Sequence, residues 1–128
     1  MSHSWRGRHG RSYQLLIIVT RCITNFALGA TSYFLKAIQW ARKYGLRINL
    51  DLHALPGSQN GWNHSGRLGR VNFLNGPMGL ANAQRSLDYI RIFAEFISQP
   101  QYRDVVTMFG IMNEPQGSIM GRENLDKL

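Results

Sequence analysis

Two apolar runs in this sequence end in polar side chains that could do acid–base chemistry. Residues 105–112 are apolar except for Thr107, and Asn113 and Glu114 follow them directly. His53 ends an earlier run in the same way. A carboxyl after so many apolar residues is expected to be partly desolvated, which raises its pKa and suits a proton donor working near neutrality. The plainer alternative is that Glu114 ends a strand and meets solvent, and the residues alone leave both interpretations open.

The segments that carry these side chains are predicted to be two strands. Residues 46–53 alternate strictly between apolar and polar side chains, which predicts a strand with one buried face. A half-exposed antiparallel strand would give this pattern, and so would a barrel strand whose inner face is polar. Residues 105–112 are apolar on both faces, as in a strand buried within a parallel sheet.

Two helices are predicted around these strands. The first begins with Ser32 as its N-cap and ends at Gly45 as its C′ residue. The second ends before Pro100, and its apolar stripe is expected to pack in the core: Leu80, Ala83, Leu87, Ile90, Ala94 and Ile97. The turn-rich residues 54–79 form a loop longer than is usual in a compact domain, which favours a functional loop. The order helix, strand, loop, helix, strand predicts an α/β fold with parallel strands.

Charge and composition exclude some classes of function. The net charge of +8 comes from residues 1–50, which hold eight Lys or Arg and no acid, whereas residues 51–128 hold seven of each sign. This excess is not arranged around stacking aromatic side chains, so we expect no nucleic-acid partner. The single cysteine, Cys22, excludes an internal disulfide.

The N-terminal segment, residues 1–30, is expected to be a separate, poorly ordered basic head. Its apolar run at 15–19 is cut short by Arg21 and is shorter than a signal-peptide core of roughly 7–15 residues. It is also too short for a membrane span, which needs roughly 20 apolar residues. We therefore expect no clear signal peptide and no span, and the run could equally be a buried strand.

A longer motif gives a resemblance to a known family. Residues 51–62 read Asp-Leu-His-Ala-Leu-Pro-Gly-Ser-Gln-Asn-Gly-Trp, Ser-Gly follows at 65–66, and Asn-Glu-Pro stands at 113–115. In this order they resemble the fungal exo-β-1,3-glucanases of glycoside hydrolase family 5, which carry Asp-Leu-His-Gly-Ala-Pro-Gly-Ser-Gln-Asn-Gly-Phe-Asp-Asn-Ser-Gly. The resemblance covers roughly residues 33–117. It implies that residues 31–128 are a fragment of a (β/α)8 TIM barrel, with about two of its eight βα units, the third and fourth.

The resemblance also implies roles for five residues. Glu114 matches the general acid/base, and Asn113 matches the residue that binds the sugar's 2-hydroxyl. His53 matches a histidine that touches the innermost sugar. Trp62 stands in place of a phenylalanine that stacks on glucose, and His64 in place of an asparagine that contacts substrate. The plainer alternatives are a half-buried histidine at His53, a loop anchor at Trp62 and a turn residue at Asn113.

The implied activity is hydrolysis of terminal glucose from β-1,3-glucan with retention of configuration, outside the cell or at the cell wall. No cofactor is implied, and no metal site is expected, because His53 and His64 lie eleven residues apart with no ligand spacing. Retention needs two carboxyls about 5–5.5 Å apart. The family's nucleophile is a glutamate on the seventh strand, beyond Leu128, so this chain is expected to be inactive alone. The alternative is a non-catalytic remnant that binds β-glucan or a partner chain.

Overall fold

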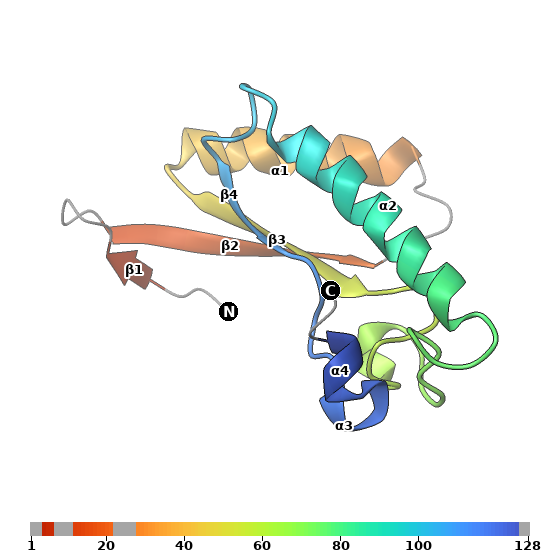
Figure 1. Cartoon of the computed structure of the whole chain (residues 1–128). Coiled ribbons are helices and arrows are strands. Elements are labelled where there is room, and N and C mark those ends of the chain that lie inside the picture. Colours follow the sequence, from red (N-terminus) through yellow and green to blue (C-terminus); the bar gives the residue numbers. More distant parts are fainter. Residues whose placement is uncertain (1–3, 7–11, 22–27, 126–128) are drawn as a thin grey trace.

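The computed structural model describes residues 4–6, 12–21 and 28–125. These residues form one sheet with two long helices, and two short helices follow the last strand (Figure 1). In chain order the elements are β1 (Ser4–Arg6), β2 (Ser12–Arg21), α1 (Leu28–Lys43), β3 (Arg47–Ala54), the 3-10 helix η1 (Asn63–Ser65), α2 (Gly79–Ile97), β4 (Val106–Gly110), α3 (Gly117–Met120) and α4 (Arg122–Leu125). No helix in this described part is long and apolar enough to cross a bilayer.

The strands lie in the order β1-β2-β3-β4. β3 pairs in parallel with β4 and also with β2, whereas β1 is antiparallel to β2. The predicted α/β class and the parallel pairing of the two motif-bearing strands are confirmed; closure into a barrel stays a prediction. The sheet has more strands than the two expected ones, because β1 and β2 of the N-terminal segment also belong to it. Residues 1–3, 7–11 and 22–27, with Cys22, lie outside the described residues.

The turn between α1 and β3 sets where β3 begins. α1 starts at Leu28, earlier than the predicted cap at Ser32, but it ends as predicted. Gly45 has a φ of +69°, and its N–H donates to the Arg42 carbonyl at 3.3 Å. The Leu46 N–H donates to the Ala41 carbonyl at 2.8 Å. These two bonds make a Schellman motif, in which a glycine accepts the left-handed conformation at little cost.

The core lies between the sheet and the two long helices, which cover the same side of the sheet (Figure 1). Burial along β3 alternates strictly, so the predicted strand with one buried face is confirmed. The first core cluster lies under α1 and contains Ile38, Ala41, Ile48, Leu50, Val105 and Val106. The second lies nearer the carboxyl ends of the strands and contains Leu52, Leu55, Val71, Phe73, Ala83 and Met120. The polar side chains of β3 therefore lie on the opposite face of the sheet.

The predicted apolar stripe of α2 is partly wrong. Leu80 is 80% exposed and Leu87 is 47% exposed, and Ala94 is exposed as well. The face of α2 that packs inward begins with small and polar residues, among them Gly79, Asn82 and Ser86. The Asn82 amide donates to the Asn72 carbonyl at 3.1 Å. Since this start of α2 packs on a polar loop, hydrogen bonding and small size set the helix orientation there, and the apolar periodicity does not.

The expected burial of the last strand on both faces is also wrong beyond Val106. Met108 is 45% exposed and Ile111 is 51% exposed. β4 is the last strand in the described sheet and pairs there only with β3. Met108 pairs with Asn49, so it shares the face of β3 that points away from the helices. Met108 is thus exposed because it lies on the face of the sheet that the helices do not cover.

Candidate active site

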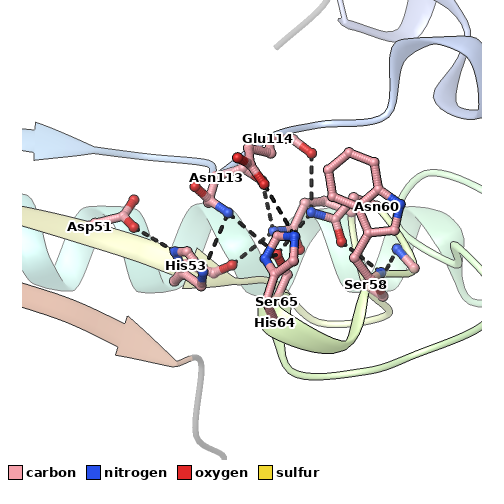
Figure 2. A network of polar contacts seen from close by, with 11 residues as sticks. Asp51, His53, Ser58, Asn60, His64, Ser65, Asn113 and Glu114 are labelled. Atoms are coloured by element: carbon pink, nitrogen blue, oxygen red, sulfur yellow. Dashed lines mark hydrogen bonds and ion pairs between the residues drawn. The ribbon is translucent and has the colours of Figure 1, made fainter.

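The carboxyl ends of β3 and β4 lie side by side and bring the predicted site residues together (Figure 2). The Asn113 amide nitrogen lies 3.5 Å from His53 Nε2. His64 Nε2 lies 3.4 Å from the Glu114 carboxylate. The rings of His53 and His64 have centroids 5.9 Å apart, and those of Trp62 and His64 are 5.4 Å apart. All five predicted residues therefore gather in one place, three from strand ends and two from the loop after β3.

Two glycines allow that loop to fold back on itself. Gly57 has a φ of +83°, and its carbonyl accepts from Asn72 N–H at 2.7 Å. A Cβ on Gly57 would meet backbone atoms of Asn72 at 2.8 Å. Gly61 has a φ of +72°, and its carbonyl accepts from Gly69 N–H at 2.9 Å. Only glycine fits such positive φ values with backbone so close. This folding places residues 62–65 beside the end of β4.

The chemistry of each partner fixes the hydrogen bonds around His53. Asp51 Oδ2 lies 2.8 Å from His53 Nδ1. An ionised carboxylate only accepts, so Nδ1 carries the hydrogen and donates it. In the neutral ring Nε2 is then an acceptor, and it faces the Asn113 amide, which donates. Asp51 thus orients His53 and leaves its second nitrogen turned toward Asn113.

Ser65 continues this network to Glu114. Its Oγ accepts from the Asn60 amide at 2.9 Å and from the Asn113 amide at 3.3 Å. The hydroxyl hydrogen is then free to donate to His64 Nδ1, which lies 3.2 Å away. His64 Nε2 in turn donates to Glu114 Oε2. Figure 2 shows the resulting chain of contacts from Asp51 to Glu114.

The side chain of Glu114 is largely exposed within the described residues. It is 55% exposed, and that of His64 is 54% exposed. Glu114 lies beyond the end of β4, the edge strand of the described sheet. Within the described residues this exposure favours the plainer alternative, in which Glu114 follows the strand and meets solvent. By contrast, the Asp51 and His53 side chains are only 17% and 21% exposed.

Sequence reasoning missed the buried polar residues that hold the site together. Gln59, Asn60 and Ser65 are all at most 2% exposed, and Asp51 binds a predicted site residue. Asp51 could have been found, because it shares a strand face with His53 two residues away. The others lie in a turn-rich loop, where spacing does not predict direction. Within the described residues, no three His, Cys, Asp or Glu side chains come together as metal ligands do.

Comparison with known proteins gives relatives of this chain. No family model matches it. A protein of Aspergillus flavus named "Probable glucan 1,3-beta-glucosidase D" is 58% identical over 83 residues, which is 65% of this chain and 10% of that protein. The protein of the same name in Aspergillus niger is 55% identical over 86 residues, 67% of this chain and 10% of its own length.

"Glucan 1,3-beta-glucosidase D" of Emericella nidulans is 51% identical over 83 residues, again 65% of this chain and 10% of that protein. The chain thus spans about a tenth of the length of the curated relatives it matches. Identity of one residue in two over more than 80 residues is far above what unrelated sequences give. Over these residues the chain is homologous to the fungal glucan 1,3-beta-glucosidases.

Proposed function

We propose that this chain carries the acid/base half of a retaining β-1,3-glucan hydrolase site, with Glu114 as the proton donor. The observation that carries the proposal is the convergence of His53, Asn113 and Glu114 at adjacent ends of two parallel strands. This is where α/β barrels place their catalytic groups. The (β/α)8 barrel, membership of glycoside hydrolase family 5 and action on terminal glucose belong to the same proposal.

The remaining predicted residues supply sugar contacts. Trp62 is 42% exposed, so its ring is available to stack on a glucose face. The Asn113 amide and His53 Nε2 contact each other at 3.5 Å, and a sugar hydroxyl could bind either nitrogen by replacing this long contact. His64 already contacts the carboxylate, so a sugar would have to share or replace that contact. The proposed ligand is β-1,3-glucan or its oligosaccharides, met outside the cell or at the cell wall.

Retaining hydrolysis also needs a nucleophilic carboxylate about 5–5.5 Å from the acid. Among the described residues, the carboxylates of Asp88 and Asp104 pair with arginines away from the site, and Glu95 and Glu123 are exposed on α2 and α4. Asp51 is bound to His53. We therefore propose that the nucleophile lies outside the described residues and that the 128-residue chain does not hydrolyse glucan by itself.

Transfer of the segment into a relative tests the catalytic role. The 83 matched residues of the Aspergillus flavus protein would be replaced by those of this chain. We expect the chimaera to release glucose from β-1,3-glucan with retention, and Glu114→Gln in it to slow the reaction by about 10²–10⁴-fold. Glu95→Gln, an exposed change on α2, is the control and should have little effect. An active Glu114→Gln chimaera would contradict the assignment.

A second candidate function is binding of β-glucan without hydrolysis. It is favoured because the described part of the site has sugar-binding groups, whereas the second carboxylate there, that of Asp51, is already bound to His53. Titration of the chain with laminari-oligosaccharides should change its tryptophan fluorescence saturably. Trp62→Phe should remove this response, whereas Trp40→Phe, on the exposed surface of α1, should keep it. Saturation in the chain together with an inactive chimaera supports the binder, and no saturation argues against it.

A further inference from the structure

The backbone around Glu114 has an unusual conformation that something must hold in place. Glu114 has a φ of +44°, in the left-handed region that residues with a Cβ rarely adopt. Glu114 is followed by Pro115 and lies beyond the end of β4, so no strand pairing in the described sheet holds its backbone. Such conformations persist where surrounding interactions over-determine them, and they occur often at functional sites. The question is which groups hold Glu114.

The side chain of Gln59 binds the peptide unit on one side of Glu114. Its amide nitrogen donates to the Asn113 carbonyl at 2.9 Å and to the His53 carbonyl at 2.9 Å. Its amide oxygen accepts from the Leu55 N–H at 3.1 Å. Gln59 is fully buried, so none of these bonds competes with water. A single side-chain amide therefore joins the ends of β3 and β4.

The side chain of Asn60 binds the peptide unit on the other side. Its amide nitrogen donates to the Glu114 carbonyl at 3.1 Å, as Figure 2 shows, and also to Ser65 Oγ. Its amide oxygen accepts from the Trp62 N–H at 3.0 Å. Asn60 is 1% exposed. The carbonyls before and after the Glu114 Cα are thus each bound by one of two neighbouring amides.

We infer that Gln59 and Asn60 are positioning residues for Glu114: together they hold its left-handed backbone and so aim its carboxylate. This rests on the proposed function for the role of the carboxylate, but the backbone interaction stands independently of it. The Gln59 main-chain carbonyl adds a third bond by accepting from Gln116 N–H at 3.1 Å. The segment before, at and after Glu114 is therefore held by one short stretch of the loop after β3. Contacts within the described residues are therefore enough to hold the backbone around Glu114.

The test compares two glutamine substitutions in the full 128-residue chain. Gln59→Met keeps the size and shape of the side chain but removes its amide. Gln101→Met makes the same change at an exposed position. NMR would report the φ of Glu114 through its three-bond amide–Hα coupling and Cα shift, with Ile48 and Leu50 reporting the core. We expect Gln59→Met to change the Glu114 signals while the core signals persist, and Gln101→Met to change neither.

The oligosaccharide affinity gives a second readout. We expect Gln59→Met to weaken binding of laminari-oligosaccharides by about tenfold, the equivalent of one hydrogen bond to the sugar. Unchanged Glu114 signals in a folded Gln59→Met chain would overturn the inference. If wild-type chain binds no oligosaccharide, the proposed function fails, but the Glu114 signals still decide the positioning role.

A measurement on the wild-type chain decides the case in which Gln59→Met does not fold. Hydrogen bonds transmit small scalar couplings between the donor nitrogen and the carbonyl carbon. Couplings from the Gln59 amide nitrogen to the carbonyl carbons of His53 and Asn113, with a positive φ at Glu114, support the inference. A negative φ at Glu114, or the absence of both couplings, overturns it.

Discussion

Replacement of Ser65 by alanine tests the hydrogen-bond network at its junction. Ser65 is 2% exposed, and its hydroxyl has three partners: the amides of Asn60 and Asn113 and the ring of His64. Ser65→Ala removes one oxygen and leaves these groups in place. The Asn60 amide nitrogen is buried and keeps only its bond to the Glu114 carbonyl. One of its hydrogens then has no partner.

The size of the effect follows from the burial of the groups left unpaired. A buried donor that loses its partner costs about 1–3 kcal/mol. The half-buried Asn113 amide regains some contact with water and adds less. We therefore expect Ser65→Ala to lower the free energy of unfolding by about 2–3 kcal/mol. Ser98→Ala is the matched control, because Ser98 is exposed and donates one hydrogen bond to the Glu95 carbonyl at 2.9 Å. It should cost within about 0.5 kcal/mol.

Urea unfolding of the two variants and the wild type measures these free energies. The ¹⁵N shifts of the His64 ring give an independent readout, because Ser65→Ala removes the donor to Nδ1. We expect a changed His64 spectrum in Ser65→Ala and an unchanged one in Ser98→Ala. Equal destabilisation of the two variants, with the His64 spectrum unaltered in both, would refute the network derived from the structure.

Two further predictions concern the loop and a surface ion pair. Gly61→Ala should destabilise the chain by about 2–4 kcal/mol because its Cβ would meet a backbone carbonyl at positive φ. Gly45→Ala has a similar φ but nothing within 4 Å, so in the same urea experiment it should cost only about 1–2 kcal/mol, and equal costs would contradict the clash. The hydrogen bond from Arg42 lowers the pKa of Asp104 below its ordinary 3.8. The stabilisation by this ion pair is therefore present above pH 3.8 and is lost as the pH falls through the lowered pKa. Asp104→Asn should flatten the acid limb of a curve of unfolding free energy against pH. An unaltered acid limb would count against the ion pair.

The strand pattern was predictable because one physical constraint dominates it. The alternation in β3 reflects one face buried under helices, and the structure reproduces it residue by residue from Arg47 to His53. The Schellman turn at Gly45 was predictable for a similar reason, since a local backbone requirement selects glycine. Parallel pairing of β3 and β4 then followed from the helix between them. These features depend on short-range rules that a single sequence carries.

The errors occurred where contacts between distant segments decide the structure. The stripe on α2 that includes Leu80 and Leu87 had the correct helical period, but the packed face is rotated toward Gly79 and Asn82. That rotation comes from a hydrogen bond to Asn72, which periodicity cannot reveal. The burial predicted for Met108 was wrong because an apolar side chain was assumed to be covered by other residues. An edge strand can be apolar and still be exposed where the described chain has nothing to place over it.

The site shows the same division. His53, Asn113 and Glu114 could be expected to meet, because parallel neighbours end at one edge of the sheet. The groups that hold them could not, because Gln59 and Asn60 reach across about fifty residues of sequence to backbone carbonyls. A motif of small and amide residues in a loop therefore has a physical interpretation besides ligand binding. Its buried amides supply donors to the residues after β4, whose backbone pairs with no strand in the described sheet, so the geometry of Glu114 depends on the loop as much as on β4.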